Sequence, residues 1–169
     1  KITVDKERPT GLLLEDRLLS LSIIGEGRSG LSVALASHGL YVDQAQAFKG
    51  AYSEGANIFF VVGYDKIVQI FDPKYYDDRD KTLDSLFSKS SFIVANRGRG
   101  GLDDVRSLFD RSENRPYSQY VATLQLPQAY QDYSSTAIRE MVGRDEKIDH
   151  LVPEEIDRFI EETGCFSPG

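Results

Sequence analysis

The sequence has 169 residues, and 20 Lys and Arg against 27 Asp and Glu give a formal net charge of −7, which argues against general nucleic-acid binding. An apolar fraction of 40% excludes a disordered chain, and apolar runs such as residues 58–62 are far shorter than the roughly 20 residues of a membrane span. One cysteine, Cys165, cannot form an internal disulfide, and we expect it to be a small buried residue under the last helix. Two separated histidines, His38 and His150, disfavour a histidine-based metal site, and we expect His38 in a loop and His150 at the surface.

Apolar spacing and the placement of Gly and Pro predict the elements of the first part of the chain. They are a strand end at residues 2–4, a helix over 12–24, a strand over 31–36, a helix over 41–52 and a strand over 58–62. The strand over 58–62 is rich in β-branched and aromatic residues, which is typical of a strand buried on both faces. We expect it at the centre of a sheet.

The same rules predict the elements that follow. They are helices near 66–71 and 82–88, a strand over 92–95, a helix over 102–109, a strand over 120–124, and helices over 135–142 and 153–163. Pro153 suits the first turn of the last helix and Gly164 suits its end. A glycine-rich basic segment, residues 96–101, follows the strand over 92–95.

Strands that alternate with helices predict an α/β fold with a mostly parallel sheet and helices on both faces, formed by one domain over residues 1–169. In such sheets ligands bind beyond the carboxyl ends of the strands. The residues that follow Val62, Ala95 and Leu124 are therefore the first candidates for a site.

Residues 25–30, GEGRSG, match the GxGxxG dinucleotide fingerprint letter for letter. That fingerprint needs a strand before it and a helix after it, so that the pyrophosphate meets the helix N-terminus. Here a predicted helix precedes the glycines and a predicted strand follows them. We interpret the segment as a loop between those elements.

Ser134, Ser135 and Thr136 stand at the start of a predicted helix, with Arg139 one turn further on. Free N–H groups and the macrodipole at a helix N-terminus favour an anion, and a guanidinium can bind phosphate with two hydrogen bonds. The pattern predicts a phosphate site. The alternative is an ordinary helix cap followed by a surface arginine.

Gly63 and Asp65 directly follow the strand over 58–62. A glycine there permits close approach of a ligand to the backbone, and a carboxylate at the end of a strand can bind a ribose diol. Asp65 can also cap the helix that follows, and both roles are compatible.

Residues 134–160, SSTAIREMVGRDEKIDHLVPEEIDRFI, resemble the C-terminal signature of the nicotinamide and nicotinate mononucleotide adenylyltransferases, an SSTxIR helix followed by an LVP helix. Gly63-Tyr64-Asp65 is similar to the family's GAD motif, with Tyr64 in place of the usual Ala. Tyr76 stands where many members carry a tryptophan that stacks on the pyridine ring. Arg97 follows a strand as a family arginine does.

The resemblance implies a Rossmann-like nucleotidyltransferase of the HxGH class. Such an enzyme transfers the adenylyl group of ATP, usually with Mg²⁺, to nicotinamide or nicotinate mononucleotide and gives NAD or deamido-NAD with pyrophosphate. The resemblance assigns binding of the ATP phosphates to Ser134, Ser135, Thr136 and Arg139. It assigns binding of the adenosine ribose to Gly63 and Asp65. Tyr76 and Arg97 would line the mononucleotide pocket, while Lys6 and Arg17 would supply charge to phosphates.

The sequence departs from the family in lacking the HxGH histidine pair and any tryptophan. Two explanations are open: the HxGH segment lies upstream of Lys1, or the protein is a catalytically inactive relative. Residues 2–6 resemble the family's second strand and its exit, which favours the first. Tyr76 can replace tryptophan in a ring stack.

Two alternatives to the assigned activity remain. One is a nucleotide-binding pseudoenzyme or regulatory module, and the other is a related cytidylyl- or adenylyltransferase with another acceptor.

The expected partners are small-molecule nucleotides, with neither nucleic acid nor membrane. A homo-oligomer is compatible with the sequence. We expect a cytoplasmic location, with the nucleus as an alternative, and no protein-bound metal site; the acidic run at residues 77–80 is interpreted as a solvated turn.

Overall fold

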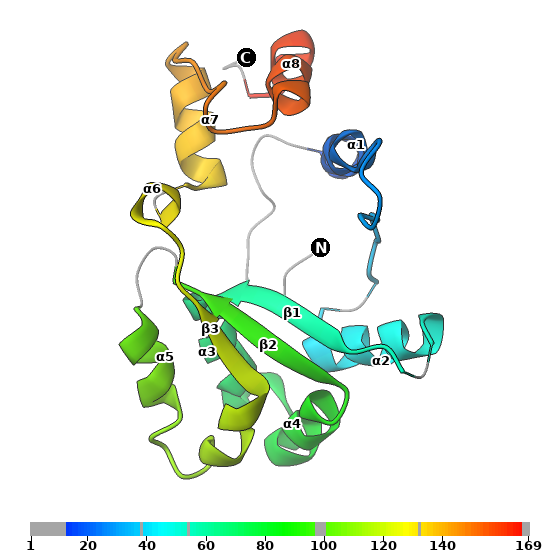
Figure 1. The fold of residues 1–169 in the computed structure, drawn as a ribbon, viewed down its shortest axis with the longest axis vertical. Helices are drawn as coiled ribbons and strands as arrows, with labels where there is room; N and C mark the ends of the chain where they lie inside the picture. Colours follow the sequence, from blue (N-terminus) through cyan, green and yellow to red (C-terminus); the bar gives the residue numbers. More distant parts are fainter. Residues whose placement is uncertain (1–12, 38, 54, 97–100, 132, 167–169) are drawn as a thin grey trace. The chain divides into compact units, whose positions relative to one another are not determined.

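The computed structural model describes residues 13–166, except 38, 54, 97–100 and 132. The chain divides into two compact units (Figure 1). The helical unit comprises residues 1–37 and 133–169, and the sheet unit comprises residues 38–132. Among the described residues, no helix is both long and apolar enough to cross a membrane.

The sheet unit contains three parallel strands in the order β1-β2-β3. They are β1 (Ile58–Gly63), β2 (Ser90–Ala95) and β3 (Val121–Leu124). In the register of β1 and β2, Phe60 lies opposite Phe92 and Val62 opposite Val94. The predicted parallel α/β architecture is confirmed. The expected central place of β1 is wrong for the described sheet, because β2 lies between the other two strands.

Helices connect and flank these strands (Figure 1). They are α2 (Tyr41–Ala51), α3 (Tyr64–Phe71), α4 (Arg79–Phe87), α5 (Leu102–Leu108) and α6 (Gln128–Gln131), with 3₁₀ turns at Pro73–Tyr75 and Arg115–Tyr120. The predicted helices near 41–52, 66–71, 82–88 and 102–109 are confirmed, with ends that differ by a few residues. Helix α6 and the 3₁₀ turns were not predicted, since they are too short to show a period.

Aromatic rings dominate the core of the sheet unit. Tyr41 of α2 meets Phe60 and Phe92 edge-on, with ring centroids 5.0 and 5.6 Å apart, and Phe87 of α4 meets Phe92 at 5.6 Å. Phe92 is fully buried. Helices α2 and α4 thus pack on one face of the sheet.

Within the described sheet unit, the side chains on the opposite face of β1 are exposed. Phe59 and Val61 are 59% and 67% exposed, because side chains alternate along a strand and these two point away from Phe60 and Val62. The expectation that this strand is buried on both faces is therefore wrong.

Arg79 ties three parts of the sheet unit together. Its Nε donates to the carbonyl oxygen of Phe71 at 3.0 Å, and its guanidinium also donates to the Asn114 side chain. Asn114 is buried and donates in turn to the carbonyl oxygen of Leu108 at 2.8 Å. These bonds fix the end of α3 relative to the end of α5.

The helical unit contains α1 (Leu14–Gly25), α7 (Ser135–Gly143) and α8 (Glu154–Thr163), as the apolar spacing predicts. Its small core consists of Ile148, Ile156, Phe159 and Ile160, with further apolar side chains of α1 and α7 packed against it. Gly164 takes a left-handed conformation, φ 59°, that ends α8 as expected.

The predicted strand over residues 31–36 is wrong, since the structure shows no regular element there. Leu31 and Leu35 are exposed, and no strand of the described sheet pairs with the segment. The preceding GEGRSG segment starts at Gly25, the last residue of α1, and continues as a loop with positive φ at Gly27 and Gly30. Its interpretation as a loop after a helix is confirmed, but the strand expected to follow it is absent from the described residues. The expected strand end at residues 2–4 lies outside the described residues.

Candidate functional site

The N-terminus of α7 is organised by Ser134. Its Oγ accepts a hydrogen bond from the backbone N–H of Ala137 at 3.0 Å, which makes Ser134 the N-cap of the helix. The N–H groups at the first positions of a helix have no partner within it, and Ser135 and Thr136 are exposed. The first turn of α7 contains no acidic residue. This helix end therefore offers free donors and the positive end of a macrodipole.

Arg139 lies one turn into α7. Its guanidinium donates to Thr136 Oγ1 at 3.1 Å, which holds the positive charge beside the helix N-terminus. The predicted cluster of Ser134, Ser135, Thr136 and Arg139 is thus brought together by one short helix. A guanidinium and backbone donors on one side can bind the same phosphate group.

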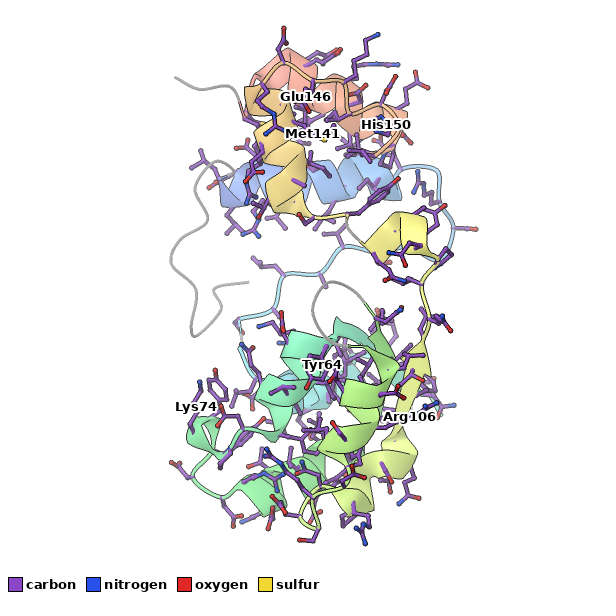
Figure 2. The ribbon with its side chains drawn as sticks, turned by 90° about the vertical axis from the view of Figure 1, so that its left-hand side faces the viewer. Tyr64, Lys74, Arg106, Met141, Glu146 and His150 are labelled. Atoms are coloured by element: carbon purple, nitrogen blue, oxygen red, sulfur yellow. The ribbon has the colours of Figure 1, made fainter. Side chains whose placement is uncertain are left out.

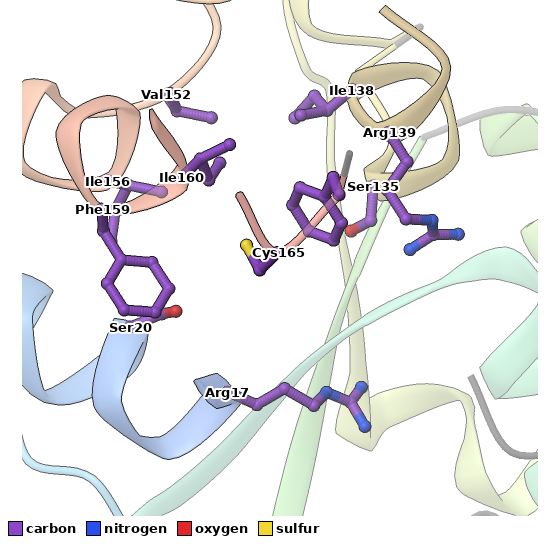
Figure 3. Close-up of a pocket in the computed structure, with 11 residues that line it drawn as sticks. Arg17, Ser20, Ser135, Ile138, Arg139, Val152, Ile156, Phe159, Ile160 and Cys165 are labelled. Carbon is purple, nitrogen blue, oxygen red and sulfur yellow. The ribbon is translucent and has the colours of Figure 1, made fainter. Parts of the chain in front are cut away.

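A pocket of about 250 Å³ lies within the helical unit next to this cluster (Figure 3). Its lining residues are Arg17, Ser20, Ser135, Ile138, Arg139, Val152, Ile156, Phe159, Ile160, Cys165 and Phe166. Two of them carry positive charge, and none of the described lining residues is acidic. The pocket combines an apolar wall with two guanidinium groups.

Arg17 reaches this pocket from α1. Its guanidinium has no hydrogen-bond or ion-pair partner among the described residues. Figure 3 shows the guanidinium groups of Arg17 and Arg139 on the side of the pocket away from Ile156 and Phe159. Two cations that no described acidic residue neutralises line one pocket, and they favour an anion with more than one charge.

Cys165 and His150 were expected to have no role in a site, and the structure agrees with the expected position of only one of them. Cys165 was expected to be a small buried residue, but it is only half-buried and lines the pocket beside Phe166. Its place follows from the turn that Gly164 makes after α8. His150 is exposed, with Nδ1 3.2 Å from Asp149 Oδ1, which confirms the expected surface position.

Gly63 and Asp65 belong to the sheet unit. Gly63 ends β1 and is the N-cap residue of α3, and Asp65 is exposed in the first turn of that helix. No side chain caps α3, so the suggested capping role of Asp65 is wrong. Its carboxylate has no hydrogen-bond or ion-pair partner among the described residues, and it lies near the carboxyl end of β1, where ligands of parallel sheets bind.

Tyr76 lies at the other end of α3. Its hydroxyl donates to the carbonyl oxygen of Ile70 at 2.8 Å, and burial raises the pKa of the phenol to about 12. The length of α3, roughly 12 Å at 1.5 Å per residue, separates this contact from Gly63. Lys6 and Arg97, the other expected contacts, lie outside the described residues.

In the part of the chain that is described, no three His, Cys, Asp or Glu side chains gather around a metal position. The acidic run at residues 77–80 has other partners. Asp78 caps α4 by accepting from the N–H of Lys81 at 3.1 Å, and Asp80 pairs with Arg79 at 2.6 Å. The interpretation of the whole run as a turn is therefore wrong, because Asp78 caps α4 and Arg79 and Asp80 form its first turn.

The parallel sheet with its connecting helices defines a Rossmann-like α/β protein. No protein-family model matches the chain. It is 28% identical over 125 residues to the probable nicotinate-nucleotide adenylyltransferase of Thermoanaerobacter sp. (strain X514), an alignment that covers 74% of this chain and 54% of that protein. The protein with the same printed name in Clostridium tetani (strain Massachusetts / E88) is 26% identical over 116 residues, covering 68% and 52%.

The chain thus spans about half the length of the curated relatives that it matches. These similarities confirm the resemblance carried by the SSTxIR and LVP motifs: the chain is similar to the nicotinate-nucleotide adenylyltransferases.

Proposed function

We propose that this protein transfers the adenylyl group of ATP to a pyridine mononucleotide and releases pyrophosphate. One observation carries the proposal: the N-terminus of α7, Arg139 and the unpartnered Arg17 border one pocket without acidic lining among the described residues. The relatives' printed names, which specify nicotinate, favour nicotinate mononucleotide as acceptor and deamido-NAD as product. Nicotinamide mononucleotide, with NAD as product, is the other candidate pair.

In this proposal the pocket of the helical unit binds ATP phosphates. Backbone N–H groups of Ser135 and Thr136 donate to phosphate oxygens, Ser134 holds the helix end in place, and Arg139 and Arg17 neutralise the charge. Nucleotidyl transfer depends mainly on positioning and on charge stabilisation, which these groups supply. A pocket of about 250 Å³ is smaller than the roughly 300–1,000 Å³ typical of ligand sites, so it would hold only part of a nucleotide.

The sheet unit has its own roles in the proposal. Asp65 accepts hydrogen bonds from the ribose hydroxyls of adenosine, and Gly63 lets the ligand approach the backbone. Tyr76 and Arg97 belong to the mononucleotide pocket, and Lys6 adds charge. Mg²⁺ would enter on the ATP phosphates, since it typically binds through substrate phosphates and few carboxylates. The proposed location is cytoplasmic.

A nucleotide-binding module that performs no transfer is the second candidate. The position of His150 favours it, because this histidine lies at the surface beside Asp149 and does not line the phosphate pocket. The two candidates agree on ATP binding and differ only in product formation.

Calorimetric titration with ATP tests the binding claim that both candidates share. Arg17→Gln should lower the affinity for ATP at least ten-fold, since a charge-assisted hydrogen bond contributes about 1.5–3 kcal/mol. Arg158→Gln is the matched control, because Arg158 is exposed on α8 and pairs with Glu154. Equal ATP affinity of wild type and Arg17→Gln would remove Arg17 from the site.

A further inference from the structure

A second cavity, of about 300 Å³, lies within the sheet unit between α3 and α5. Val68, Phe71 and Leu108 give it an apolar wall, and Tyr64 and Arg111 also line it. None of the residues assigned above to phosphate, ribose or pyridine lines this cavity. Its volume reaches the lower end of ligand sites, about 300 Å³, which suits a molecule with a single ring.

Two hydrogen-bond donors of the cavity lack partners. Arg111 is exposed, and its guanidinium makes no hydrogen bond or ion pair with any described residue. The hydroxyl of Tyr64 likewise has no hydrogen-bond partner in the described part of the chain. Figure 2 labels Tyr64, the residue that begins α3 directly after β1.

The charge of the cavity is set by Arg111. Asp72 also lines it, but its carboxylate is engaged: Oδ1 accepts from the backbone N–H of Lys74 at 3.0 Å, and Oδ2 lies 3.4 Å from Lys74 Nζ. Lys74 therefore neutralises Asp72, whereas nothing in the described residues neutralises Arg111. The cavity favours an anion.

The walls are held in place by the fold. Arg79 donates to the carbonyl oxygen of Phe71 and to Asn114, and Asn114 donates to the carbonyl oxygen of Leu108, so partly and fully buried hydrogen bonds join the two sides of the cavity. A preformed cavity lowers the entropy that a ligand loses on binding.

We propose that this cavity binds a small aromatic carboxylate. The ring lies against Tyr64 and Phe71, where aromatic pairs gain energy beyond their buried area. The carboxylate accepts from the Arg111 guanidinium and the Tyr64 hydroxyl, which are the two unpartnered donors. The site is independent of the proposed phosphate pocket, because each is formed within its own unit.

Ligand-observed NMR titration of the full chain with benzoate tests this proposal, and benzamide serves as the uncharged probe of nearly the same shape. Benzoate should bind at least ten-fold more tightly than benzamide, since a charged partner roughly doubles the strength of such hydrogen bonds. Arg111→Gln should remove that preference. Arg106→Gln is the matched control, because Arg106 lies on α5, pairs with Asp103 at 2.9 Å and does not line the cavity.

Tyr64→Phe keeps the ring and removes only the hydroxyl, so benzoate binding should weaken about two- to ten-fold, as expected for one net hydrogen bond. Thermal melts of both variants should match the wild type, because Arg111 is exposed and Tyr64→Phe preserves the packing. Equal binding of benzoate and benzamide, no binding of either, or unchanged benzoate binding in Arg111→Gln would each overturn the proposal. None of these outcomes depends on ATP binding or on adenylyl transfer.

Discussion

The two units of the chain use their side chains differently. In the sheet unit, rings such as those of Phe60, Phe87 and Phe92 contact one another and are shielded by helices. In the helical unit, a small core around Phe159 borders a pocket with two guanidinium groups at its mouth. Aromatic packing gives stability, whereas partly exposed cations such as Arg17 and Arg139 contribute little to it and are available to a ligand.

This contrast predicts a separation of effects. Substitutions in the aromatic core should lower the free energy of unfolding, and substitutions of the pocket cations should lower ATP affinity and leave stability unchanged.

Phe92→Ala should give the largest loss. Phe92 is fully buried at the centre of the ring cluster, and such truncations cost about 3–5 kcal/mol of unfolding free energy. Urea denaturation measures the loss. The control is Phe59→Ala on the neighbouring strand, where the ring is 59% exposed. Similar losses for the two variants would contradict the one-sided burial of the sheet.

Arg139→Ala should weaken ATP binding by about 1.5–3 kcal/mol through loss of a charge-assisted phosphate contact. The melting temperature should hardly change, because the guanidinium bonds only to the exposed Thr136 hydroxyl among the described residues. Titration calorimetry and a thermal melt of the same sample separate the two quantities. Arg158→Ala provides a charge-matched comparison, and unchanged ATP affinity in Arg139→Ala would exclude Arg139 from the site.

Ser134→Ala should lower the free energy of unfolding by about 1 kcal/mol, since it removes the N-cap hydrogen bond of α7. Ser135→Ala should cost less, because Ser135 makes no such cap. Denaturant unfolding of the two variants gives the comparison. If Ser135→Ala proves the more destabilising change, the cap has been assigned to the wrong residue.

Asp65→Ala should reduce affinity for adenosine nucleotides by about 0.5–1.5 kcal/mol, the net contribution of one hydrogen bond. Stability should fall by no more than the helix-dipole contribution of about 0.3–1 kcal/mol, since Asp65 does not cap α3. Asp43→Ala is the comparison, because Asp43 also lies in the first turn of its helix, α2, and has no proposed ligand role. A binding loss as large in Asp43→Ala would show that general charge, and not ribose contact, determines affinity.

Alkaline pH should affect the sheet unit through Tyr76 and Tyr117. Burial raises the pKa of both phenols from 10.0 to about 12, so the folded state favours the neutral forms. Their contribution to stability is complete below pH 10 and is lost as the pH rises towards 12. In Tyr76→Phe, the free energy of unfolding should fall less between pH 10 and pH 12 than in the wild type. Urea denaturation at these two pH values measures the difference. An equally steep decline in the variant would contradict the role of Tyr76.

The sequence predicted the features that depend on local patterns. The period of α8, the end at Gly164 and the cap at Ser134 follow from residues close together in the chain. The strand over residues 31–36 failed because a short apolar run does not show whether another strand pairs with it. The exposure of Phe59 could not be predicted either, because it depends on which face of the sheet the helices cover.

The candidate site was predicted in part. Ser134 to Arg139 form one helix turn and were found from spacing alone. Arg17 of α1 and Arg139 of α7 line the same pocket, and no sequence periodicity links elements so far apart in the chain. Cys165 and the apolar wall of the pocket were missed as site residues, although the inward face of α8 was visible in its spacing.

The most direct test of the proposed adenylyl transfer is an assay of the natural full-length gene product for deamido-NAD formed from ATP and nicotinate mononucleotide. We expect deamido-NAD together with equimolar pyrophosphate. The yield of both should fall strongly in Arg139→Ala but not in Arg158→Ala. ATP binding without product from either the nicotinate or the nicotinamide mononucleotide would contradict the proposed transfer.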